Sequence, residues 1–368
     1  MANVRKHFTF VCFAAAALCV VNTCAKVHGR SNDVSRHSVV WTDLLPEPGL
    51  AWLQSKGVPT YHNAMPLGNG HVGSLLNYEA ENDTIAIMVA ASSSWAESGE
   101  FLKVALLEIS LPKRQGAPLS PGFRQVFNPQ DATIQLDIPA GGQAPPLQIL
   151  AYIDASSDNV VLSISPATAS VSARLVALRP TPRVKRPGAD CQTYEVSADV
   201  TNAAGNLVYH RNSLAGANSY MVKTFQHLNM PLVPGFVDPL ENRTTGLLLA
   251  RTHATRHNTN TTVIVATLLT AHTDTAAEFE DAIGAASEKF IAALRGSVDR
   301  LPPPAHTSWW AAKWAGHSIA LSAAAGANAR TAADTARLSQ LYVLQRFIEL
   351  SQARSPYPST HSHRRTHT

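Results

Sequence analysis

The sequence predicts a mainly β protein, an antiparallel sandwich or barrel, with helices confined to its C-terminal part. Short runs rich in Val, Ile, Leu and Thr recur between Gly, Pro, Asn and Asp clusters from residue 39 to about residue 270. Several runs alternate apolar and polar residues, as in Thr133–Ile138, which is the period of a half-buried strand. Many strands without long intervening helices favour this class over a doubly wound α/β fold.

Composition sets the limits within which this fold must form. The chain has 368 residues, of which 45% are hydrophobic and 15% charged, so it can build a real core as one large or two medium domains. The net charge is +4 and the basic residues are spread along the chain. We therefore expect no nucleic-acid partner.

The first 25 residues have the pattern of a cleaved signal peptide. Arg5 and Lys6 precede an uncharged apolar run from Phe8 to Val21, and the small residue Ala25 suits cleavage. The run is shorter than the roughly 20 residues that span a bilayer, which favours cleavage over a membrane anchor. We expect a secreted protein that is free of the membrane once the signal is removed.

Cysteines and glycosylation sequons fit this expectation. Outside the signal the chain keeps Cys191 alone, which excludes an internal disulfide, and no catalytic motif surrounds this thiol. Three sequons follow the signal and need only exposed loops in a secretory compartment. Their asparagines, Asn82, Asn242 and Asn260, are candidate N-glycosylation sites.

The segment Met65–Gly73 reads as a tight turn that opens onto a strand. Gly68, Asn69 and Gly70 all tolerate positive φ, which a turn requires. A hairpin turn without further role is one interpretation, since Gly-Asn-Gly is common turn chemistry. The other is a surface that faces a ligand or another domain.

Further candidate strands follow along the chain. They are Thr84–Val89, Val104–Leu111, Thr133–Ile138, Leu147–Ile153, Asn159–Ile164, Ser170–Ala177, Thr193–Val200, Leu207–Tyr209, Ser219–Phe225, Gly246–Ala250 and Thr262–Thr270. The basic, proline-rich segment Arg179–Pro187 is interpreted as a solvated connection, with polyanion binding as the alternative.

The pattern becomes helical near residue 275. Thr275 and Glu278 form a capping box, and apolar residues then recur at helical spacing up to Gly296. A proline-rich linker, Leu301–Pro304, marks a domain boundary. Beyond it, one predicted helix places four residues on one face: Trp310, Trp314, His317 and Leu321. A core role is favoured for the tryptophans over sugar stacking.

A second predicted helix beyond the linker starts at a cap formed by Thr331. Its predicted apolar face consists of Leu341, Leu344, Phe347, Ile348 and Leu350.

Several segments carry a family resemblance. Met65–Gly70 resembles the N-terminal signature of glycoside hydrolase family 95 and its relatives. Other segments look more like the related family called domain of unknown function 5703, in order from about Trp41 to Tyr357. They are Ser92–Trp95 with Gly99 and Leu102–Lys103, Phe123–Gln125, Tyr209–Ser213, Asp238–Gly246, His306–Trp314 and Tyr342–Arg346. Ser94 departs from the pattern, because an acidic residue is expected there.

The resemblance implies the architecture of the six-hairpin glycosidase superfamily. Residues 26–274 would form a β-supersandwich, 275–304 a helical linker, 305–358 the first helices of a truncated (α/α)6 barrel, and 359–368 a disordered tail. In family 95 the reaction is inverting hydrolysis of α-L-fucosides or related sugars. The residues for that chemistry would lie in the barrel beyond this chain, so we assign no catalytic residue.

Two hypotheses of function remain. The chain is either the N-terminal portion of a glycoside hydrolase, inactive without its barrel, or a non-catalytic extracellular carbohydrate-binding module. Both imply a glycan or oligosaccharide partner, and both make Asn69 and Trp95 the candidate ligand-facing residues. No motif for a metal or cofactor occurs, so we expect neither. The sequence leaves the oligomeric state open.

Overall fold

The computed structural model describes residues 25–27, 34–44, 64–185, 194–256, 259–295, 300–315, 319 and 321–351. The predicted signal peptide, apart from Ala25, lies outside these residues. So do Cys191, Gly296, His317 and the predicted tail 359–368.

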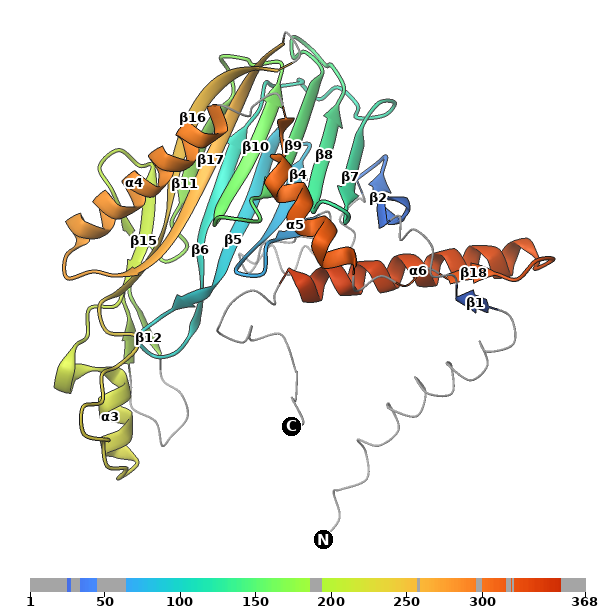
Figure 1. Cartoon of the computed structure of the whole chain (residues 1–368). Helices are drawn as coiled ribbons and strands as arrows, with labels where there is room; N and C mark the ends of the chain where they lie inside the picture. Colours follow the sequence, from blue (N-terminus) through green and yellow to red (C-terminus); the bar gives the residue numbers. More distant parts are fainter. Residues whose placement is uncertain are drawn as a thin grey trace.

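Two antiparallel sheets form a sandwich (Figure 1). The larger sheet contains β2 (Val39–Trp41), β7 (Arg124–Asn128), β8 (Thr133–Ile138), β9 (Leu147–Ile153), β10 (Asn159–Ser165), β14 (Val200–Thr201), β15 (Leu207–Arg211), β16 (Arg243–Arg256) and β17 (Thr259–His272). The smaller contains β3 (Met65–Gly68), β4 (Val72–Glu79), β5 (Thr84–Trp95), β6 (Phe101–Ser110) and β11 (Ser172–Val176). The prediction of a mainly antiparallel β fold is confirmed.

The strand order shows how the sandwich is connected. The nine-stranded sheet has the order β14-β15-β16-β17-β10-β9-β8-β7-β2, and the five-stranded sheet the order β11-β6-β5-β4-β3. Two short pairs accompany them: β1 (Ala25–Val27) with β18 (Leu321–Ala323), and β12 (Arg183–Lys185) with β13 (Tyr194–Val196).

The core explains why β10 is an almost continuous apolar run. Val160 and Leu162 face the space between the sheets, while Val161 faces the other side of the larger sheet. Both sides are covered, so neither set of side chains meets water. A strand buried on both faces loses the apolar–polar alternation of a half-buried one.

Helix α4 (Ala276–Arg295) covers the outer face of β16 and β17 (Figure 1). Its first turn is closed by the predicted capping box. The Glu278 amide donates to Thr275 Oγ1 at 3.2 Å, and the Thr275 amide donates back to Glu278 Oε2 at 3.3 Å. Phe279 and Ile283 are buried against the sheet, as their spacing predicts.

Helices α5 (Pro304–Ala315) and α6 (Ala329–Leu350) pack into the same core as the two sheets. The Trp310 ring stacks on Phe347 at 5.4 Å between centroids, and Phe347 meets Phe127 of β7 at 4.7 Å. Trp310 and Trp314 of α5 are therefore core residues, which was the favoured interpretation. Within the described residues these helices form no barrel, and the barrel stays a prediction.

Segment Ser219–Phe225 was predicted as a strand, and this was wrong. It lies in the helix α3 (Tyr220–His227), which follows the short 3-10 helix η3 (Gly216–Asn218). Ser219 caps α3, because its Oγ accepts from the Val222 amide at 3.4 Å. The same hydroxyl donates to Asp238 across the following loop. Tyr, Val, Thr and Phe favour strands, but this cap and tertiary contact override that preference.

The predicted limits and faces of the last helices also need correction. Helix α6 begins two residues before Thr331, because Asn328 is its cap and accepts from the Thr331 amide at 2.8 Å. Leu341 is 53% exposed and lies off the buried face, which runs through Val343 and the predicted Phe347. The other predicted residues of this face, Leu344, Ile348 and Leu350, pack partly buried against the core. Leu321, predicted on the helix that contains Trp310, lies beyond the end of α5 in β18.

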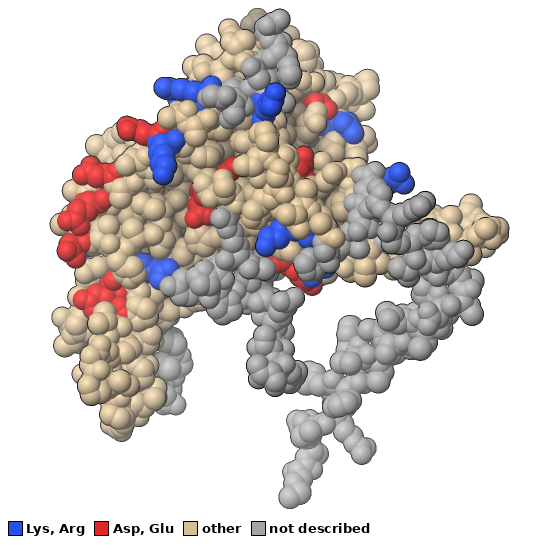
Figure 2. All heavy atoms as spheres, viewed as in Figure 1, with Lys and Arg blue, Asp and Glu red and all other residues tan. Residues whose placement is uncertain are grey.

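Within the described residues, no helix is both long and apolar enough to cross a bilayer. Figure 2 shows Lys and Arg side chains at separate places on one face, with acidic ones between them. Arg179 lies buried beside Asp199, with Nη2 at 2.6 Å from Oδ1, so this arginine is no part of a solvated basic loop.

Candidate functional site

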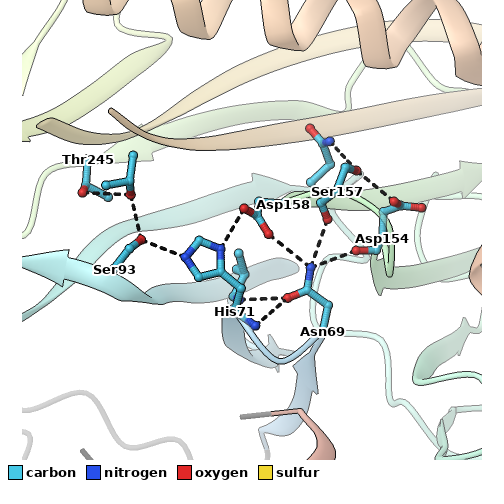
Figure 3. Close-up of polar contacts among 10 residues, drawn as sticks. Asn69, His71, Ser93, Asp154, Ser157, Asp158 and Thr245 are labelled. Carbon is cyan, nitrogen blue, oxygen red and sulfur yellow. Dashed lines mark hydrogen bonds and ion pairs between the residues drawn. The ribbon is translucent and has the colours of Figure 1, made fainter. Parts of the chain in front are cut away.

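The turn between β3 and β4 is fixed by the buried Asn69 side chain (Figure 3). Its Nδ2 donates to the carbonyl oxygens of Asp154 at 2.9 Å and Ser157 at 3.0 Å. Its Oδ1 accepts from the amides of His71 at 3.0 Å and Val72 at 2.9 Å. The amide group thus ties this turn to the turn between β9 and β10, more than eighty residues away.

His71 is held between an acid and a hydroxyl. Its Nδ1 lies 2.7 Å from Asp158 Oδ2, and its Nε2 lies 2.9 Å from Ser93 Oγ. With a proton on Nδ1 facing the carboxylate, Nε2 accepts from the Ser93 hydroxyl. The side chains of His71 and Asp158 are 20% and 31% exposed, so this pair lies at the surface.

Two threonine hydroxyls extend this chain into the space between the sheets. Ser93 Oγ is 2.8 Å from Thr270 Oγ1, which is 3.0 Å from Thr245 Oγ1. In one consistent order Thr245 donates to Thr270, Thr270 to Ser93, and Ser93 to His71. The network joins β5 of the smaller sheet to β16 and β17 of the larger one (Figure 3).

Ser93 sits in an irregular part of β5. Ala90 faces Lys103 on β6, but Trp95 already faces Phe101, so β5 carries extra residues between these two pairs. Such bulges turn a side chain away from its regular direction. Here the bulge lies next to the turn that carries His71.

This geometry limits what the cluster can do chemically. The order Asp158, His71, Ser93 is that of an acid, a base and a nucleophile. Ser93, however, is 4% exposed, and its oxygen also contacts Thr270. The hydroxyl is therefore not presented to a substrate, and the groups that reach solvent are the imidazole and the carboxylate. This arrangement suits binding of a polar ligand better than covalent catalysis.

The C-terminal end of helix α6 packs against the β3–β4 turn. The Gly70 amide donates to the carbonyl of Ser351, the residue after α6, at 2.8 Å. A side chain at Gly68 would place its Cβ 2.6 Å from the Cβ of Ser351, so glycine is needed for this close approach. The β3–β4 turn therefore also holds the C-terminal end of α6 in place.

Trp95 lies at the far end of β5 and is half-buried. Its Nε1 donates to the Ser92 carbonyl at 2.7 Å, and its ring meets Phe101 edge-on at 5.6 Å. The Trp95 carbonyl accepts from Asn212 Nδ2 at 3.1 Å. The structure therefore places Asn69 inside the turn cluster and Trp95 partly at the surface, and their contact with a ligand stays a prediction.

The carboxylates near Trp95 have structural partners. Glu97 Oε1 accepts from the Ser213 amide and, at 2.9 Å, from the Leu214 amide. Asp238 accepts from Ser219 and from the Leu240 amide. Both are buried, which suits this loop-ordering role.

Sequence reasoning singled out Asn69 but missed its partners. Asp158 carries no local motif. Ser93 lies in the Ser92–Trp95 segment of the family resemblance, but nothing in that segment indicates a contact with His71. Both residues join His71 through the pairing of strands far apart in the chain. The predicted sequons lie on turns or strand ends: Asn82 and Asn260 are exposed and Asn242 is half-buried. Within the described residues, no group of three His, Cys, Asp or Glu side chains could hold a metal ion.

Comparison with known proteins identifies a family and similar solved structures. A family model described as "Domain of unknown function (DUF5703)" matches residues 54–316. A solved structure named "Putative kojibiose phosphorylase from human microbiome" is similar at 11% sequence identity with a TM-score of 0.40. The similarity covers 84% of this chain and 39% of that one, so this chain spans less than half of that protein. No curated protein matches the chain.

Proposed function

The chain belongs to the DUF5703 N-terminal domain family, and we propose that it is the β-sandwich portion of a secreted carbohydrate-active protein. The sandwich would bind a glycan at the partly exposed His71–Asp158 pair. The activity of the complete assembly would be hydrolysis of a glycosidic bond, with α-L-fucosides as the first substrates to test. The sandwich itself would not be catalytic.

One observation supports the binding role most directly. A partly exposed carboxylate and imidazole are held rigidly by the buried Asn69, which contacts both turns. Sugar hydroxyls donate to carboxylates, and each Asp158 oxygen keeps acceptor capacity beside its contact with His71 or Asn69. A carboxylate held in this way can bind a sugar without first becoming ordered. The resemblance of Met65–Gly70 to the family 95 signature supports the choice of sugar class.

The alternative is a carbohydrate-binding module with no enzymatic partner. The half-exposed indole of Trp95 supports it, because an indole face can stack on the apolar face of a pyranose. The two proposals differ in whether a helical catalytic part is required for activity, and they share the glycan-binding surface.

A glycan array followed by calorimetry tests the binding surface. We expect the secreted chain to bind fucosylated oligosaccharides, and Asp158→Asn to weaken binding at least tenfold. The substitution keeps the shape of the side chain and removes its charge. Asp281→Asn, which neutralises an exposed carboxylate on α4, is the matched control and should bind like the wild type.

Activity and binding measurements on this chain test both proposals together. An aryl α-L-fucoside should stay intact with this chain alone, since no catalytic residue is assigned to it. Hydrolysis that persists in Asp158→Asn would place a catalytic site elsewhere in the chain. Failure to bind any glycan, with a folded protein by circular dichroism, would overturn the carbohydrate proposal in both forms.

A further inference from the structure

His306 connects helix α5 to both neighbouring turns of the larger sheet and is fully buried. Its Nδ1 accepts a hydrogen bond from the Ala155 amide at 3.1 Å. Its Nε2 lies 2.6 Å from the carbonyl oxygen of Asp131, to which it must donate. A backbone amide can only donate and a carbonyl can only accept. The two contacts therefore fix one tautomer, the neutral ring with its proton on Nε2.

A second proton on this ring would break the contact to the sheet. Protonated Nδ1 and the Ala155 amide would both be donors, so their hydrogen bond would be lost and a cation would be buried. His306 also lies in the first turn of α5, where the helix dipole disfavours positive charge.

The charged and titratable groups around the ring act in opposite directions. Burial lowers the pKa of His306, and the carboxylates of Asp131 and Asp154 raise it without compensating fully. Asp131 accepts from Thr133 at 2.8 Å, and burial raises the pKa of its own carboxyl. The Tyr152 ring of β9 also lies beside His306, edge-on, with 4.9 Å between the ring centroids.

The same contact reaches the candidate site. Ala155 belongs to the turn whose Asp154 carbonyl accepts from Asn69, and Asp158 of this turn contacts His71. The turn is therefore held from one side by α5 and from the other by the Gly68–Gly73 turn. Loss of the His306 contact removes one of these two attachments.

We propose that His306 is an acid-operated latch that pins helix α5 to the Asp154–Asn159 turn when neutral and releases it when protonated. Release loosens the turn that carries Asp158. The consequence for glycan binding rests on the proposed function, whereas the release of α5 does not.

Three measurements on the full chain follow the latch. NMR of ¹⁵N-labelled histidine should show the Nε2-protonated tautomer of His306 at pH 8 and its protonation below the ordinary pKa of about 6.5. Hydrogen exchange should show protection of the Ala155 amide falling at least tenfold from pH 7 to pH 5, after correction for the intrinsic pH dependence of exchange. The fluorescence of Trp310 and Trp314 in α5 should change over the same pH range, from pH 7 to pH 5.

Variants separate the latch from general acid unfolding. His306→Gln keeps one acceptor and one donor and does not titrate, so the fluorescence step should disappear from the range between pH 7 and pH 5. His253→Gln removes an exposed histidine of β16 and should leave the step in place. If His306→Gln does not fold, the wild-type NMR titration decides alone.

Either of two results would overturn the latch: His306 stays neutral down to pH 4.5 while the protein is folded, or the step persists in folded His306→Gln. If a glycan binds, its affinity should fall with the same midpoint in the wild type and not in His306→Gln. If acid releases α5 as expected but the protein binds no glycan, the proposed function is overturned and the latch is still supported.

Discussion

The carboxylate of Asp83 and the guanidinium of Arg114 form a buried ion pair, with 2.9 Å between Oδ1 and Nε. The two side chains are 6% and 4% exposed. The Tyr78 hydroxyl donates to the same carboxylate at 3.0 Å, and burial raises the pKa of this hydroxyl, which keeps it a donor. Asp83 thus fixes the turn that carries the Asn82 sequon.

We expect Asp83→Asn to lower the free energy of unfolding by about 3 kcal/mol, because it leaves the buried Arg114 charge without its counter-ion. Asparagine also tolerates the positive φ of 46° at this position, so the change isolates the charge from backbone strain. Urea unfolding followed by circular dichroism measures the difference.

Glu108→Gln is the control for this ion pair. It breaks the pair with Arg174, whose side chain is 74% exposed, and should cost less than about 1 kcal/mol. If both substitutions lower the free energy of unfolding equally, the buried Asp83–Arg114 pair contributes no more to stability than an exposed pair.

Gly246 is required by the contact between β15 and helix α4. A Cβ at this position would lie 2.6 Å from Tyr209 Cβ and 2.9 Å from Phe279 Cε1. Tyr209 faces Gly246 across the strand pair and packs against Phe279 at 5.5 Å between ring centroids. We expect Gly246→Ala to destabilise the protein by about 1–3 kcal/mol through overpacking.

A second glycine provides the opposite expectation. Gly284 lies within α4, where an added Cβ would meet no neighbouring side chain or strand within 4 Å, so Gly284→Ala should be neutral or stabilise by up to about 1 kcal/mol. Thermal unfolding of both variants gives the comparison. A stable Gly246→Ala protein would mean that α4 can shift away from the sheet at little cost.

Local signals in the sequence predicted the parts of the fold that depend on neighbours in the chain. The alternation in Thr133–Ile138 marks β8 with its observed limits, and Thr275 with Glu278 marks the start of α4. Ser219–Phe225 shows where this fails: its residue types favour a strand, but its cap and the contact of Ser219 with Asp238 make it helical. The secondary structure of this segment is therefore set by contacts that local residue preferences do not reveal.

The candidate site depended still more on distant contacts. Asn69 stood out because Gly-Asn-Gly is a turn signal, yet the sequence does not reveal that its side chain points inward to Asp154 and Ser157. His71 and Asp158 are brought together by two turns from different sheets. Such pairs have no sequence spacing of their own, because strand pairing and sheet packing set their positions.

The last prediction concerns Asn69 and Trp95, the residues expected from the sequence to face a glycan. Asn69→Ala removes the hydrogen bonds that hold both turns and leaves buried carbonyl and amide groups unpaired, so we expect a loss of at least about 2 kcal/mol of stability. Any loss of glycan binding should then track the loosened His71–Asp158 pair. Trp95→Ala should instead weaken binding about tenfold with a smaller effect on stability, because the ring is half-buried.

Trp309→Ala is the matched control for Trp95, since it removes another half-buried indole, on α5. Thermal unfolding and glycan titration on all three variants separate stability from binding. A direct contact of Asn69 with the sugar would appear as lost binding in an Asn69→Ala protein whose unfolding temperature is unchanged. Unchanged glycan affinity in both Asn69→Ala and Trp95→Ala would remove both residues from the binding surface and leave the His71–Asp158 pair as its remaining candidate.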